Sequence, residues 1–178
     1  MFLKGIKQPI IKISILLFLV VFLFTGCVSK SLTVEKREEG TVYSTPKIRL
    51  LGFGDTAGQD QDVSVLSEVI CASDKQCEGD EYIVTLIHFG NFQVFEGKEA
   101  SFLADGQPVL TNGEPEYFNE YTEEWYEQYT VYFTKKDFKV LANAGSVVIE
   151  VSELKLKLSP ENREWWKMLI NPLNPPSK

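Results

Sequence analysis

The sequence predicts a single α+β domain, built mainly of antiparallel sheet with two to three short helices. Segments rich in Val, Ile, Tyr, Phe and Thr follow one another between glycine-containing turns. Parallel strands would need a crossover helix between each pair, and no regular helical segments separate these strands. Helix start and stop signals occur at only a few places. Runs of strands with segregated helices are typical of the α+β class.

Strands are expected where β-branched and aromatic residues cluster between turn residues. In chain order these segments are residues 48–51, 82–89, 92–95, 100–104, 107–111, 126–134, 146–151 and 154–158. The dipeptides Asp105-Gly106 and Asn112-Gly113 are typical of tight hairpin turns, because their residues adopt positive φ readily.

Three helices are expected, each with a start signal. Residues 63–70 follow Asp62 as a candidate N-cap, with apolar residues at helical spacing. Thr134, with Asp137 three residues later, resembles a capping box, and Gly145 is a stop signal. Residues 159–171 begin with Ser-Pro and end before a second proline, so they form the last predicted helix.

The most unusual segment is residues 116–129, in which aromatic and acidic residues alternate. Tyr117, Tyr121, Trp125 and Tyr129 are four residues apart and all odd-numbered, so they share a face in a helix or in a strand. We expect residues 125–133 to be mostly buried and residues 117–121 to lie outside the core. The side chains that would then form a binding surface are Tyr117, Phe118, Tyr121 and Trp125.

The N-terminus carries the features of a secretory signal peptide. Three lysines are the only charged residues of segment 1–26, and residues 13–24 are apolar except for one serine. A membrane-spanning helix needs about 20 apolar residues, whereas the core of a signal peptide needs about 7–15. The short apolar run therefore predicts a signal peptide at residues 1–26.

The apolar run ends in the sequence LFTGC, which resembles the lipobox of bacterial lipoproteins. The match lies at Thr25, Gly26 and Cys27, and Phe24 stands where leucine is usual. The resemblance implies cleavage after Gly26 and attachment of acyl chains such as palmitate to Cys27. Buried acyl methylenes contribute about 0.8 kcal/mol each, enough to anchor a soluble domain. The domain would then face the periplasm or the cell exterior, at the outer membrane in a Gram-negative cell.

Residues 27–46 are polar and end in a proline, so we expect the lipidated cysteine to be followed by a flexible tether. Such a coil reaches roughly 25 Å. The globular domain is then residues 47–178. Removing residues 1–26 from the 178 leaves 152 residues with 15 basic and 25 acidic side chains, a formal charge of −10. An acidic domain repels nucleic acid, which excludes it as a partner.

Besides Cys27, the chain has only Cys71 and Cys77. In an oxidising compartment such an isolated pair predicts a local disulfide, with free thiols as the main alternative. A zinc site would need two more soft ligands, and His88 is the only histidine. The sequence therefore predicts no metal and no cofactor.

Two loop motifs give weaker signals. Residues 52–58, GFGDTAG, follow a strand, but their glycines miss the dinucleotide-binding spacing by one residue, which favours a surface turn. Asp55, Asp60 and Asp62 could offer oxygens to calcium. The glycine and glutamate that an EF-hand loop requires are not at their positions, so a solvated acidic loop is favoured.

His88 is the only side chain that could act as an imidazole base, and it lies in the apolar strand 82–89. We expect a core or edge histidine satisfied by one hydrogen bond, because triad partners would have to come from distant strands. No catalytic residue is predicted.

Three hypotheses for function follow from these features. The first is a lipid-anchored cell-envelope protein whose domain has a binding or structural role without catalysis. The second is glycan or peptidoglycan binding by the Tyr/Trp segment 117–129. The third is an envelope hydrolase. The expected partners are the membrane, through the lipid anchor, and an envelope protein or glycan.

Overall fold

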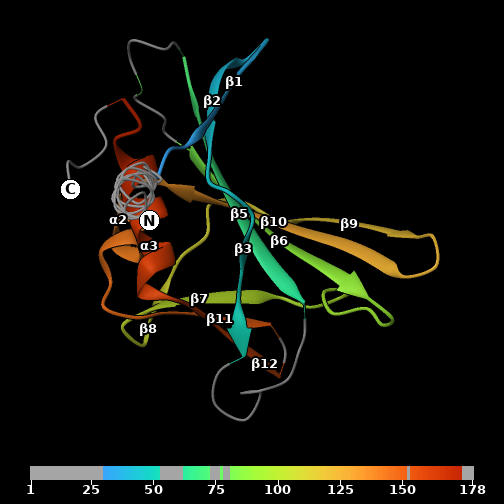
Figure 1. Cartoon of the computed structure of the whole chain (residues 1–178). Coiled ribbons are helices and arrows are strands. Elements are labelled where there is room, and N and C mark those ends of the chain that lie inside the picture. The colour runs from blue at the N-terminus through green and yellow to red at the C-terminus, as the bar shows by residue number, and fades with distance from the viewer. Residues whose placement is uncertain (1–29, 53–61, 73–76, 78–80, 152, 174–178) are drawn as a thin grey trace, which may run out of the picture. The chain divides into compact units, whose positions relative to one another are not determined.

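The computed structural model describes residues 30–52, 62–72, 77, 81–151 and 153–173 (Figure 1). The described residues from Leu32 onward belong to one compact unit. The predicted signal peptide, Cys27 and most of the glycine- and aspartate-rich loop, residues 53–61, lie outside the described residues. In the part of the chain that is described, no helix is long and apolar enough to cross a membrane.

The larger of two sheets has seven strands. Its order is β1-β2-β5-β6-β10-β9, and β3 also pairs with β5. The strands are β1 (Thr33–Arg37), β2 (Gly40–Ser44), β3 (Ile48–Arg49), β5 (Val63–Cys71), β6 (Glu81–Gly90), β9 (Glu116–Tyr121) and β10 (Trp125–Thr134). Every pairing is antiparallel. The predicted α+β class with mainly antiparallel strands is confirmed.

The smaller sheet has five antiparallel strands in the order β4-β12-β11-β7-β8. They are β4 (Leu51–Gly52), β7 (Ala100–Ala104), β8 (Gln107–Val109), β11 (Val147–Val151) and β12 (Leu154–Leu158). Asp105 and Gly106 connect β7 to β8 with φ angles of 51° and 79°, which confirms the predicted turn.

Two helices, α2 (Lys135–Asn143) and α3 (Pro160–Ile170), begin where the sequence predicts. The Thr134 hydroxyl oxygen accepts a hydrogen bond from the backbone N–H of Asp137 at 3.2 Å. Ser159 caps α3 in the same way through the N–H of Asn162 at 3.2 Å. These caps satisfy donors that the first turn of a helix leaves without intrahelical partners.

Two predictions for single elements are wrong. The segment predicted as a helix at residues 63–70 is strand β5, in which Val63, Val65 and Val69 alternate inward. Because β5 lies between β2 and β6 and pairs with both, its side chains follow the strand period of two and not the helical period. Residues 92–95, predicted as a strand, form an irregular, bent segment between β6 and β7.

The predicted tether at residues 27–46 is also wrong from Thr33 onward. This segment forms the hairpin β1–β2, and β2 pairs with β5. Val42 and Tyr43 are buried, so the hairpin contributes apolar surface as well as backbone pairing. The sheet therefore begins at the residues that the polar composition assigned to a linker.

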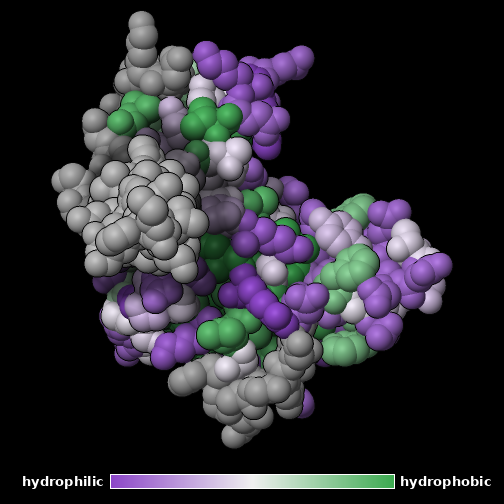
Figure 2. All heavy atoms as spheres, viewed as in Figure 1, coloured by the Kyte–Doolittle hydropathy of each residue, from purple (hydrophilic) through white to green (hydrophobic). Residues whose placement is uncertain are grey.

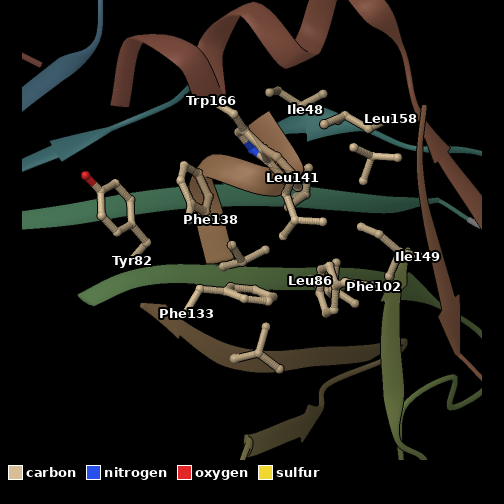
Figure 3. Close-up of a cluster of buried hydrophobic side chains, with 14 of the residues drawn as sticks. Ile48, Tyr82, Leu86, Phe102, Phe133, Phe138, Leu141, Ile149, Leu158 and Trp166 are labelled. Carbon is tan, nitrogen blue, oxygen red and sulfur yellow. The ribbon is translucent and has the colours of Figure 1, made fainter. Parts of the chain in front are cut away.

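One hydrophobic core joins the two sheets and both helices (Figure 3). Phe102 of β7 meets Phe133 of β10 edge to face, with ring centroids 5.0 Å apart. Phe138 of α2 lies between Tyr82 of β6 and Trp166 of α3, at centroid distances of 4.5 and 5.3 Å. Aromatic side chains of this size dominate the burial of a small core.

Cys71 and Cys77 form the predicted disulfide, with their Cα atoms 4.5 Å apart. Cys71 is the last residue of β5 and its side chain is buried. The bond therefore fixes the start of the β5–β6 connection to the core. A loop this short contributes roughly 2 kcal/mol in the chain-entropy account.

Candidate functional site

The segment of alternating aromatic and acidic residues forms a hairpin at one edge of the larger sheet. It is built from β9 and β10, joined by residues 122–124, and it points away from the helices and the smaller sheet (Figure 1). All six residues of β9 are exposed. We call residues 116–126 the aromatic hairpin.

The four predicted binding residues divide between the two faces of this hairpin. Tyr117, Tyr121 and Trp125 share one face, as their odd numbers require in a strand, and Phe118 lies on the other. Tyr121 is 61% exposed and Phe118 is 52% exposed, whereas Trp125 is half-buried. The structure thus places three of the four on one face, with Tyr121 and Trp125 in contact, and Phe118 on the other.

Trp125 and Tyr121 form a ring pair near the end of the hairpin. The two residues are cross-strand neighbours, and their ring centroids lie 5.0 Å apart with planes inclined by 49°. A pair of this kind contributes roughly 0.5–1.5 kcal/mol beyond its burial. The pair is a preformed aromatic surface, because each ring limits the freedom of the other.

The opposite face carries a row of three aromatic rings. Tyr126 lies between Phe89 of β6 and Phe118 of β9, with centroid distances of 6.5 and 6.4 Å. The sequence analysis missed Phe89 and Tyr126 as members of this surface. Tyr126 was assigned to a strand, but only the register that pairs it with Phe89 shows that the two rings are adjacent.

A buried carboxylate fixes the hairpin to the body of the sheet. Glu127 is 0% exposed, and its two oxygens accept four hydrogen bonds. Its donors are the backbone N–H groups of Val94 at 2.5 Å and Phe95 at 3.1 Å, the Tyr117 hydroxyl at 2.8 Å and Nδ1 of His88 at 3.1 Å. A buried carboxylate needs such a set of donors, because its desolvation is otherwise costly.

His88 is 1% exposed, which confirms the expectation of a histidine held in the sheet by a hydrogen bond. It is the cross-strand neighbour of Glu127, and its ring contacts those of Phe92 and Phe95. Gly90 lies so close that a Cβ there would be 2.9 Å from Nε2 of His88. Neither His88 nor Glu127 is accessible to a substrate, so the pair has a structural role in this arrangement.

Tyr117 connects the buried carboxylate to the surface. Its hydroxyl donates to Glu127 and accepts from the side-chain amides of Asn119 at 3.1 Å and Gln93 at 3.5 Å. Burial and, second, the hydrogen bond to Glu127 raise the pKa of Tyr117 above its usual value. Tyr117 therefore stays protonated and keeps its role as a donor at neutral pH.

The surroundings of the hairpin are acidic. Residues 99–134 contain eight Asp or Glu residues and no Lys, Arg or His. The exposed acids around β9 are Glu114, Glu116, Glu120 and Glu123, and Glu124 is partly buried. Figure 2 shows apolar and polar side chains interspersed over this end of the molecule. A shallow depression beside the turn is lined by Phe89, Asn91, Thr122, Glu123 and Glu124.

The described residues contain no group of three or more His, Cys, Asp or Glu arranged to hold a metal ion. Their fold and surface define an antiparallel α+β domain with an exposed aromatic hairpin. No family model, curated protein or solved structure matches the chain.

Two alanine variants should show which ring of the Tyr121–Trp125 pair contributes to the stability of the fold. Trp125→Ala removes a half-buried indole, so we expect a loss of about 1–2 kcal/mol and a melting temperature lower by several degrees. Tyr121→Ala removes a mostly exposed ring and should leave the melting temperature nearly unchanged. Thermal unfolding followed by circular dichroism tests both. A Trp125→Ala protein that melts like the wild type would show that the indole contributes only to the surface.

Proposed function

We propose that this protein is a lipid-anchored envelope protein whose domain binds another envelope protein through the aromatic hairpin, without catalysis. The observation that carries the proposal is the full exposure of β9, which presents three aromatic residues on a strand with one neighbour. Exposed aromatic residues are enriched where proteins bind one another. An exposed group of apolar side chains on a protein surface is typical of a site that binds another molecule.

The anchor follows from the lipobox resemblance and from the charge of the domain. With a formal charge of −10, the domain from residue 27 onward is repelled by anionic headgroups. Attraction of the domain itself therefore does not hold the protein at a membrane. Acyl chains on Cys27 would supply the attachment and leave the hairpin free to meet its partner.

Replacing the predicted lipidation residue tests the anchor. Cys27→Ser should move the protein from the membrane fraction to the soluble fraction of its own host, because serine cannot receive the thioether-linked lipid. The control is the double variant Cys71→Ser, Cys77→Ser, which removes the disulfide, leaves Cys27 as the remaining cysteine and should stay with the membrane. Mass spectrometry of the N-terminal peptide identifies the acyl chains. Membrane retention of Cys27→Ser would contradict the lipid anchor.

Photo-crosslinking from the hairpin tests the binding function. A benzophenone amino acid at Phe118 or Tyr121, in protein expressed in its own host, should give the same protein adduct from both positions. The control position is Val34 on β1, which is 56% exposed at the opposite edge of the sheet. We expect no such adduct from Val34. Equal adducts from all three positions, or none from positions 118 and 121, would contradict binding through the hairpin.

Glycan binding is the second candidate function, and one observation favours it. The Tyr121–Trp125 ring pair lies on the same hairpin face as the amide of Asn119 and the hydroxyl of Tyr117. Sugar rings stack on aromatic faces and their hydroxyls bind amides, so this combination suits a saccharide. Co-sedimentation with purified peptidoglycan that Tyr121→Ala abolishes would favour this function, provided that no protein adduct forms.

A further inference from the structure

We propose that the outer edge of β9 accepts an added β-strand, and that its occupant is an extended, cationic segment of the partner protein. This inference rests on the proposed function and specifies the chemistry of the partner. Strand addition uses the backbone N–H and C=O groups of an edge strand for affinity. Alternate side chains of the added strand then contact the two faces of the hairpin.

The edge at β9 is protected by charge of one sign only, and it lacks the proline, basic residues or shortness of the other sheet edges. Exposed edges are usually blunted by charge, proline or shortness, because their free backbone groups can pair with another chain. In the larger sheet, β1 carries Glu35, Lys36 and Arg37. In the smaller sheet, β4 has two residues, and β8 has three with Pro108 in the middle. Among the described strands at the ends of the two sheets, β9 is the one longer than three residues that has neither proline nor a basic residue.

Strand β9 is also fixed in an extended conformation by its contacts with the rest of the sheet. All six residues of β9 pair with β10 in a continuous register. The Tyr117–Glu127 hydrogen bond ties the middle of the hairpin to the buried His88. An edge that is already extended loses little conformational freedom when another strand pairs with it, and this favours binding.

Charge identifies the occupant. The eight acids and absence of bases between residues 99 and 134 give the hairpin one sign of charge. If β9 paired with β9 of a second copy of the chain, Glu116 and Glu120 of the two copies would lie beside one another. Like charges on neighbouring strands oppose pairing. A segment with lysine or arginine at alternate positions would instead bring its cations beside Glu116 and Glu120, on the face that also carries the ring of Phe118. Its other side chains would lie on the face of Tyr121 and Trp125.

The probe for this inference is a capped eight-residue peptide of alternating lysine and valine. We expect it to bind the full-length lipoprotein in neutral detergent, measured by isothermal titration calorimetry. A second peptide has the same side chains but N-methyl groups on all its backbone amides, so it cannot donate ladder hydrogen bonds. Strand addition predicts at least tenfold weaker binding of the methylated peptide. No binding of the unmodified peptide, or equal binding of both, would overturn the inference.

Two pairs of charge reversals locate the site. Glu120→Lys with Glu123→Lys should weaken binding of the unmodified peptide at least tenfold. Glu38→Lys with Glu39→Lys changes the same charge on the exposed β1–β2 turn and should alter affinity by less than twofold. If both variants lost the same affinity for the peptide, the binding would depend only on the net charge of the protein, and the proposed site at β9 would be wrong. Displacement of the peptide by peptidoglycan fragments at lower concentration would assign the surface to a glycan instead.

The two experiments fail independently. If protein adducts form from positions 118 and 121 but the unmodified peptide does not bind, the proposed function stands and strand addition is wrong. If the peptide binds as expected and no protein adduct forms in the host, the edge accepts a strand but the proposed envelope partner is wrong.

Discussion

Replacing Glu127 with leucine should destabilise the domain by about 3–5 kcal/mol, because four hydrogen-bond donors lose their buried acceptor at once. Two of these donors are backbone N–H groups of Val94 and Phe95, which cannot rotate away. Leucine supplies similar volume but no acceptor. A loss of this size is a large part of a typical net stability of about 5–15 kcal/mol. Urea denaturation of the purified protein measures it.

Two further variants separate the parts of this network. Glu127→Gln retains one acceptor oxygen but points an amide N–H group toward donors. Its loss of unfolding free energy should therefore be smaller than that of Glu127→Leu and still exceed about 1 kcal/mol. Tyr117→Phe removes only the hydroxyl donor and should cost about 1 kcal/mol. A Glu127→Leu protein as stable as the wild type would show that the carboxylate does not hold the hairpin in place.

Local signals explain why much of the fold could be predicted. The caps of α2 and α3 depend on residues within three positions of each other, so Thr134 and Ser159 marked both helix starts correctly. Strand β12 alternates Leu and Lys, and its inward leucines follow directly from that pattern. Elements whose conformation depends on neighbouring residues were therefore predictable from the sequence.

The failures have a common physical cause, which is long-range pairing. In β5 the residues Val63, Leu66 and Ile70 fit a helical period, while Val63, Val65 and Val69 fit a strand period, and only the neighbours β2 and β6 decide between them. Residues 33–44 look like a linker because their apolar residues are few. Pairing with β5 recruits the segment into the sheet and buries Val42 and Tyr43.

The candidate site shows the same division. The turn signals at Asn112-Gly113 and Pro115 predicted that residues 117–121 lie outside the core, and all five are exposed. The hydrogen bond between His88 and Glu127 joins residues 39 positions apart on neighbouring strands. No local pattern encodes that register, so the group that organises the hairpin could not be predicted from the sequence.

The largest loss of stability without a change in charge should come from Trp166→Ala. Trp166 is fully buried and its ring lies against Phe138, where α2 and α3 meet the larger sheet (Figure 3). Truncating a buried tryptophan removes its transfer free energy and leaves a cavity, at a cost of about 3–5 kcal/mol. We expect the melting temperature to fall by roughly 10 °C or more.

The neighbouring tryptophan provides the matched control. Trp165 on the same helix is only partly buried, so Trp165→Ala should cost distinctly less than Trp166→Ala. Trp166→Phe tests the chemistry of the site, since the indole Nε1 is buried and has no hydrogen-bond partner among the described residues. Phenylalanine removes this unsatisfied donor while it keeps most of the apolar volume, so its net loss should be below about 2 kcal/mol. Equal destabilisation by Trp166→Phe and Trp166→Ala would contradict this account, because the apolar volume that phenylalanine retains would then contribute nothing to the stability of the core.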